Sequence, residues 1–229
     1  MTLPQLIDKR DNFEIIRDEI AAILALETAS QQALAVGAGK NPQLWTFDVF
    51  VERDRPWESL SALEEPVDPI VNVWFDNEDF ARNQSFNSLQ HTVDPGIFNI
   101  DVVTSALSKK NVGAGYDPAD YQAKTDCQRI MRLIRNIFFS VPPDTKQPGQ
   151  DYQFLNLRGV VGYRRIQSLT SFQVDYQKQA VAVAAGRIVL AVKYLETALE
   201  GPYRNFELLQ VQATTTTNGQ VVIDFDLTG

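Results

Sequence analysis

The sequence is poor in the residues that carry most protein chemistry, with one cysteine, Cys127, and one histidine, His91. A single cysteine excludes a disulfide within the chain, and a cysteine nucleophile needs a base close by. A metal site needs several His, Cys or carboxylate ligands. We therefore interpret Cys127 as a small buried residue of a helix, and His91, in the polar run NSLQHTVDPG, as a loop residue.

Pairs of acids at a spacing typical of catalysis are also lacking. Glu64 and Glu65 are adjacent, but a solvated loop explains them better than an acid and base in a pocket. The sequence thus predicts no catalytic residue, no cofactor-binding residue and no metal ligand. We expect a protein that is not an enzyme and that carries no cofactor.

The stretch of the chain that is rich in alanine and valine does not form a long uncharged hydrophobic run. A membrane-spanning helix needs about 20 largely uncharged residues, and the stretch AVAVAAGRIVLAVKYLE at 180–196 is interrupted by Arg187. The first residues, MTLPQLIDKRDNFEII, lack a basic region followed by an apolar run, so no secretory signal is expected. These features predict a cytosolic protein without a membrane partner.

Binding of nucleotides or nucleic acid is disfavoured as well. The stretch VGAGKNP resembles part of a phosphate-binding loop, but that motif needs Ser or Thr after the lysine and a strand before it. Here Asn41 follows Lys40, and a helical pattern precedes them. The chain has 21 basic and 29 acidic residues and a formal charge of −8, so DNA that meets it should be repelled and free to slide.

The residues that are present suit a packed globular protein with extended arms. Hydrophobic residues make up 44% of the 229 residues, which is enough for a sizeable core. An amphipathic helix is predicted over 11–35, with Asp11 and Glu14 in capping-box positions and apolar residues at helical spacing. That apolar set is Phe13, Ile16, Ile20, Ile23, Leu24 and Leu34.

A second helix is predicted within 116–140, where Asp117 is a good cap and Pro118 suits the first turn. One apolar face should lie on a sheet; it contains Tyr121, Cys127, Ile130, Met131, Ile134, Ile137 and Phe138. Strands are predicted in 44–52, 70–76, 97–107 and again from 152 onward. The first three follow one another without a helix between them, which favours an antiparallel sheet.

The stretch at 180–196 alternates in a way that fits a strand better than a helix. Val181, Val183 and Ala185 share one parity, and Ile188, Leu190, Val192 and Tyr194 share the other. A bulge at Gly186 would reconcile the two, by changing which parity points inward. A helix stays open as an alternative, because alanine favours it.

The tail from Asn205 to Leu227 is predicted to be a β-hairpin, because Asn218-Gly219 separates two β-rich runs. An isolated hairpin is marginally stable in water, so it should join a sheet of its own subunit or of another one. The candidate assembly interface is the apolar row Val221, Ile223, Phe225 and Leu227.

We divide the chain into an α+β domain at 1–200 and a hairpin arm at 201–229. The expected fold class is α+β, with a mainly antiparallel sheet packed by two principal helices.

The order of elements also carries a family resemblance. A strand such as GIFNIDVVTSALSKK, then a helix of the type YQAKTDCQRIMRLIRNIF, then a closing strand AGRIVLAVKYLE resembles the tail terminator proteins of tailed bacteriophages. The resemblance covers about residues 11–196 through element order and strand character. The long connection at 52–69 and the hairpin after Gly201 depart from shorter members of the family.

Similarity to this family implies a structural virion protein that forms a homo-oligomeric ring, a homohexamer, on the head-proximal end of the tail tube. The implied partners are the tail tube protein, a neck or connector protein and, in a contractile tail, the sheath protein. DNA would pass through the lumen without specific binding. The implied location is the virion, with the host cytoplasm during assembly. Alternatives are a neck or head-completion adaptor, the cap of a contractile injection particle or, from another class, a small-ligand protein or enzyme.

Overall fold

The computed structural model describes residues 10–54, 56, 65–81, 90–111, 115–139, 152–173, 181–197, 212–215 and 221–224. The chain falls into two units. The larger unit, the body, runs from Arg10 to Thr197. The other unit contains the described strands β8 (Gln212–Thr215) and β9 (Val221–Asp224), which pair antiparallel as the sequence predicts.

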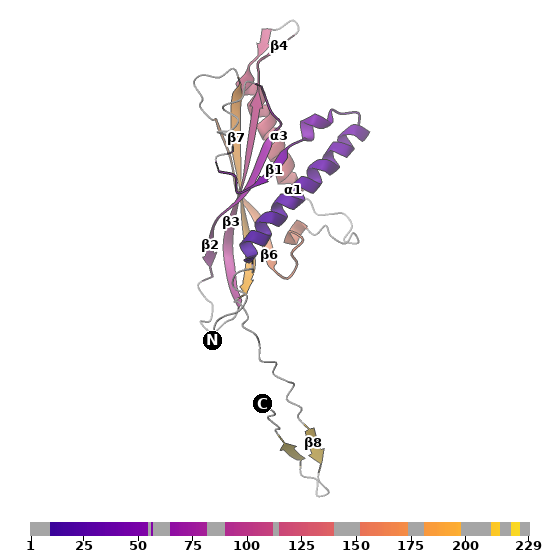
Figure 1. The fold of residues 1–229 in the computed structure, drawn as a ribbon, viewed down its shortest axis with the longest axis vertical. Helices are drawn as coiled ribbons and strands as arrows, with labels where there is room; N and C mark the ends of the chain where they lie inside the picture. Colours follow the sequence, from indigo (N-terminus) through magenta and orange to yellow (C-terminus); the bar gives the residue numbers. More distant parts are fainter. Residues whose placement is uncertain are drawn as a thin grey trace. The chain divides into compact units, whose positions relative to one another are not determined.

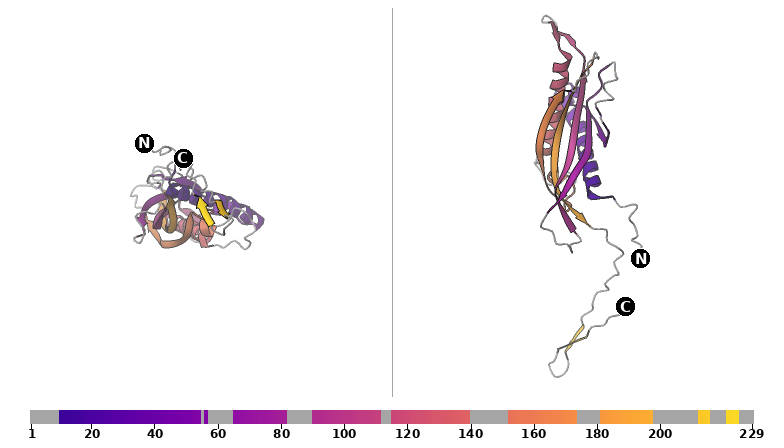
Figure 2. Two further views of the ribbon diagram at one scale, coloured as in Figure 1. Left: turned by 90° about the horizontal axis from the view of Figure 1, so that it is seen from below. Right: turned by 90° about the vertical axis from the view of Figure 1, so that its left-hand side faces the viewer.

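The body follows the order helix, strands, helix, strands (Figure 1). Its elements are α1 (Asn12–Gly37), η1 (Pro42–Trp45), β1 (Asp48–Val51), β2 (Ile70–Phe80), β3 (Gln90–Ala106), β4 (Lys109–Asn111), β5 (Gly115–Asp117), α3 (Ala119–Phe139), η2 (Tyr152–Phe154), β6 (Val161–Gln173) and β7 (Ala182–Thr197). β4 and β5 form a small separate sheet. The other five strands form one mixed sheet, and α1 and α3 lie on the same face of it (Figure 2).

The sheet has the strand order β1-β2-β3-β7-β6, and every neighbouring pair except β1 and β2 is antiparallel. The predicted α+β class with a mainly antiparallel sheet is therefore confirmed. The expectation that the first three strands are all antiparallel is wrong for β1, which runs parallel to β2. Parallel neighbours need a long crossover connection, and the 52–69 segment supplies one.

Helix α1 starts as its sequence predicts, because the backbone N–H of Asp11 donates to the Glu14 carboxylate at 3.1 Å. Ile16, Ile20 and Leu24 are fully buried under the sheet. Leu34 was predicted to share this buried face, but it is 64% exposed. The next residue, Ala35, is buried instead, so the covered side of the helix does not include Leu34 at this turn.

By length and composition, α1 is also apolar enough to cross a membrane. The core helix of a soluble protein passes the same test, and the burial of Ile16, Ile20 and Leu24 against the sheet fits such a core helix.

Helix α3 packs on β3 and β7, with Cys127, Ile134 and Phe138 fully buried. Tyr121, which the apolar pattern placed on the same face, is 62% exposed. The amphipathic body of Tyr allows this position at a helix surface. The predicted strand at 152 is replaced by the 3-10 turn η2, and β6 begins at Val161.

Strand β7 confirms the preference for a strand at 180–196 but contradicts the predicted bulge. The pairing of β3 with β7 continues without a shift from Ala106↔Ala182 through Val102↔Gly186 to Gly96↔Val192. Ala184, Ile188 and Leu190 therefore face the helices, while Val183 and Ala185 face away. Those two belong to a second buried cluster with Ile70 and Val103, against which Phe172 packs. Both parities are buried, so alternation alone could not tell which one is inward.

Candidate functional site

The predicted assembly row lies partly within the described hairpin. Val221 and Ile223 belong to β9, where they pair with Thr215 and Ala213 of β8. Phe225, Leu227 and the predicted Asn218-Gly219 turn lie outside the described residues. The backbone pairing thus fixes the register of the hairpin, and the role of the row in assembly stays a prediction.

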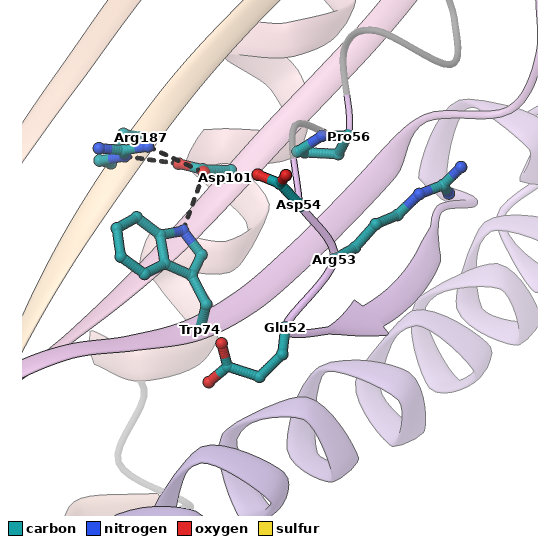
Figure 3. A pocket seen from close by; sticks show the side chains of 7 residues that line it. All are labelled: Glu52, Arg53, Asp54, Pro56, Trp74, Asp101 and Arg187. Atoms are coloured by element: carbon teal, nitrogen blue, oxygen red, sulfur yellow. Dashed lines mark hydrogen bonds and ion pairs between the residues drawn. The ribbon is translucent and has the colours of Figure 1, made fainter.

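The body holds a buried polar cluster that the sequence analysis did not single out (Figure 3). It combines Trp74 of β2, Asp101 of β3 and Arg187 of β7, three neighbouring strands of the sheet. Asp101 and Arg187 are direct cross-strand partners. They lie on the sheet face opposite the helices, because Ile100 and Val102 on either side of Asp101 belong to the core under the helices.

Both oxygens of the buried Asp101 carboxylate accept hydrogen bonds within this cluster. The Arg187 guanidinium donates to the two Asp101 oxygens, through Nε at 2.6 Å and an Nη at 3.0 Å. The indole N–H of Trp74 donates to Asp101 at 2.9 Å, and the guanidinium lies 4.9 Å from the centre of the Trp74 ring. The Asp101 side chain is 3% exposed and that of Arg187 33% exposed.

Hydrogen bonding to Asp101 is the main cause that raises the pKa of Arg187 above its usual value, against a smaller opposing effect of burial. The pair is held by forked hydrogen bonds, which are among the stronger kinds in proteins. A carboxylate buried without such partners would cost several kcal/mol. The burial of Asp101 therefore depends on its two partners, Arg187 and Trp74.

A pocket of about 250 Å³ opens beside the cluster, between the sheet and the residues that follow β1. It is lined by Glu52, Arg53, Asp54, Pro56, Trp74, Asp101 and Arg187. The Asn72 side chain accepts from the Arg53 N–H at 2.9 Å and donates to the Arg53 carbonyl at 3.0 Å. This two-way contact ties the start of the 52–69 connection to β2.

Glu52 strengthens the same junction. Its backbone N–H donates to the Val73 carbonyl at 2.9 Å, and its carboxylate accepts from the Phe75 N–H and from Arg17, each at 3.1 Å. Its φ of 53° lies in the left-handed region, which non-glycine residues adopt infrequently. The junction is thus fixed by several contacts from one residue. In the pocket wall, Trp74, Asp101 and Arg187 also have partners within the chain.

The structure shows the surroundings of Cys127 and His91, the two residues with which the sequence analysis began. Among the residues that the structure describes, no group of three or more His, Cys, Asp and Glu side chains is arranged to hold a metal ion. The thiol of Cys127 is buried, with Sγ 3.9 Å from both the Val102 carbonyl and the Met131 sulfur, and burial raises its pKa to about 12. His91 lies in β3 rather than in a loop, with its ring edge-on to Phe80.

One signal in the sequence could have pointed to the cluster. Asp101 and Arg187 each interrupt a strongly apolar strand, and such interruptions in two strands that pair are a sign of a buried ion pair. The sequence alone does not give the register, so the partners could not be matched.

No protein family matches the sequence, and no curated protein is detectably similar to it.

Proposed function

We propose that this protein is a structural component of a bacteriophage tail, a tail terminator that forms a ring, with six copies, on the head-proximal end of the tail tube. The ring stops the growth of the tube and presents a surface to the neck. In a contractile tail it would cap the sheath as well. The protein would reside in the virion and, during assembly, in the host cytoplasm.

The observation that carries the proposal is the order of elements in the body. A helix, a set of strands, a second helix and a pair of long strands follow one another, with both helices on one face of a mainly antiparallel sheet. This is the order in which the sequence resembles tail terminators. The hairpin of β8 and β9 adds an element outside the body that is suited to joining a sheet.

The proposed partners are further copies of the chain, the tail tube protein, a neck or connector protein and the sheath protein. DNA would pass through the lumen without a specific site. The charge of −8 supports this role, because an acidic wall does not hold a phosphate backbone by counterion release. A neck or head-completion adaptor, or the cap of a contractile injection particle, is the alternative within the same class.

A small-ligand protein is favoured by one observation, the pocket beside Asp101 and Arg187. Its volume of about 250 Å³ lies just below the range of about 300–1,000 Å³ that is common for ligand pockets. Glu52, Asp101 and Arg187 of its lining are already engaged in contacts within the chain. We therefore rank this function below the structural one.

Native mass spectrometry and a capping assay test the proposal together. The purified chain should form a ring of six copies, and its addition to growing tail tubes should stop elongation and leave one labelled ring at one end of each tube. Twelve copies bound to a portal would indicate a neck protein instead. A monomer that carries a tightly bound small molecule and leaves tube growth unchanged would contradict the proposal.

A further inference from the structure

The outward face of α3 carries a continuous row of large and basic side chains, the α3 stripe. It consists of Tyr121, Lys124, Gln128, Arg132, Arg135 and Phe139. Spacings of three and four residues place them on one side of the helix, and all six are exposed. Tyr121 and Phe139, at the two ends, are 62% and 60% exposed. The row contains no acidic residue, in a chain whose net charge is −8.

The cations of the stripe have no ion-pair partner in the part of the chain that the structure describes. Within the described residues, no ion pair engages Lys124, Arg132 or Arg135, whereas the neighbouring Arg129 pairs with Asp126 at 2.6 Å. The Arg135 guanidinium lies 5.3 Å from the centre of the Phe139 ring. Tyr, Phe and Arg are among the residue types enriched at protein interfaces. The stripe therefore has the composition of a docking surface for an acidic partner.

The body carries a surface of the opposite charge, the acidic margin. Its exposed acids lie on β1, on β2 and in the described residues between them: Asp48, Glu52, Asp54, Glu65, Asp68, Asp76 and Asp79. Within the described residues, Glu65, Asp68 and Asp79 have no ion pair. The exposed Phe80, at the end of β2, adds an apolar contact to this margin.

The fold places the two surfaces on different sides of the body. β1 and β2 form one edge of the sheet, and α3 packs across β3, β7 and β6 toward the other edge. A molecule with complementary surfaces on two sides can associate head to tail, and such heterologous contacts close into rings when the rotation allows it. Nucleic acid is a weaker match for the stripe, because the overall negative charge opposes its approach.

We propose that the α3 stripe of one copy docks on the acidic margin of the next copy, and that this contact forms the ring. This inference rests on the proposed function and names the surfaces that join its subunits. Charged groups at the contact steer the encounter and fix its register, while Tyr121, Phe139 and Phe80 supply apolar area. Since the contact is charged, raising the salt concentration should weaken the ring.

Charge reversal in two variants tests the contact. The stripe variant carries Lys124→Glu, Arg132→Glu and Arg135→Glu, and the margin variant carries Glu65→Lys, Asp68→Lys and Asp79→Lys. For each variant alone, native mass spectrometry should show a ring fraction at least tenfold below that of the wild-type chain. The circular dichroism spectrum and the melting temperature should stay unchanged. An equal mixture should regain rings that contain the two variants in equal numbers, because only unlike neighbours attract.

A control variant with Lys40→Glu reverses an exposed lysine outside α3 and should keep the wild-type ring. If the stripe variant forms rings at the same protein concentration as the wild-type chain, the inference is overturned and the proposed function still stands. Failure of the mixture to regain rings would also overturn it. Absence of rings from the wild-type chain at every concentration would instead refute the proposed ring itself. A stripe variant that keeps its ring but loses binding to labelled duplex DNA would assign the stripe to nucleic acid.

Discussion

Cys127 is a residue whose surroundings decide its chemistry. Its thiol is fully buried under the sheet, and burial raises its pKa to about 12. At pH 8 the folded chain therefore holds Cys127 as the neutral thiol, which is not the reactive form. The acid at the preceding position, Asp126, acts in the same direction on the pKa as burial does.

We predict that Cys127 in the folded chain reacts with a maleimide at pH 8 at least a hundredfold more slowly than in the chain unfolded in urea. An ordinary thiol pKa of about 8.5 leaves roughly a quarter of the unfolded thiol ionised at that pH. A Thr125→Cys, Cys127→Ala variant provides the matched control, because Thr125 is an exposed position on the same helix. Equal rates for Cys127 in the folded and unfolded chains would show that the thiol is accessible.

The cluster of Trp74, Asp101 and Arg187 shows what residue patterns can and cannot reveal. In the sequence of β3, Phe98, Ile100 and Val102 share one parity and Asn99 and Asp101 share the other, which is the alternation of a strand. In the structure Asp101 is buried, because Arg187 from β7 and Trp74 from β2 cover it and satisfy its oxygens. Partners from other strands decide its burial, and one strand's sequence does not contain them.

Strand β7 illustrates the same limit for a whole element. The period of two in its sequence identified the strand despite its alanines, because side chains alternate between the faces of a sheet. The inward parity could not be identified, since Val183 and Ala185 are buried on one face and Ile188 and Leu190 on the other. The bulge predicted at Gly186 was wrong because it assumed that only one parity at a time is buried. A glycine in a strand marks either a bulge or a close approach, and here it marks a close approach.

Gly186 lets α3 lie close to the sheet. An added Cβ would come within 2.3 Å of the Met131 sulfur and 3.2 Å of the Thr170 carbonyl oxygen. We predict that Gly186→Ala lowers the free energy of unfolding by about 1–3 kcal/mol, the usual cost of overpacking a core. Chemical denaturation at neutral pH would measure it.

Two further variants isolate the contact. In a Met131→Ala background, Gly186→Ala should cost at least about 0.5 kcal/mol less, as expected for residues that touch. Gly162→Ala is the matched strand control, because the nearest atom to its Cβ would be the Lys193 carbonyl oxygen at 3.6 Å, an ordinary contact. Equal costs at Gly162 and Gly186 would show that the approach of Met131 is not what the glycine permits.

At the scale of the molecule, the class of fold was predictable because it depends on the order and period of elements. The parallel start of the sheet was not, since the direction of β1 depends on where the 52–69 connection takes the chain. The junction of Glu52 and Asn72 with the pocket could not be foreseen either, because it joins residues that are distant in sequence. The hairpin was predicted from its turn residues, and the pairing of β8 with β9 confirms it.

The hairpin raises the question of what stabilises it. A two-stranded ribbon alone is marginal in water, and in the sequence its second arm places Val221, Ile223, Phe225 and Leu227 on one face. Burial of each such side chain contributes on the order of 1.5–3 kcal/mol before ordering costs. Repeated around a ring, this is enough to decide whether subunits stay together, so we expect the hairpin to act as an assembly arm.

Deletion of residues 217–229 should therefore leave the body folded but reduce ring formation and tail completion. Circular dichroism, native mass spectrometry and counts of finished tails would follow the three properties separately.

Replacing Val221, Ile223, Phe225 and Leu227 with serine should reproduce the deletion, because it removes the apolar row and keeps the chain length. Replacing Val222, Asp224 and Asp226 with serine changes the other parity of the predicted arm and should have a much smaller effect, because successive residues of a strand point to opposite faces. A truncated chain that folds, forms rings and completes tails at the normal rate would show that the arm is dispensable. A chain that no longer folds would show that the hairpin stabilises its own subunit rather than the contact between subunits.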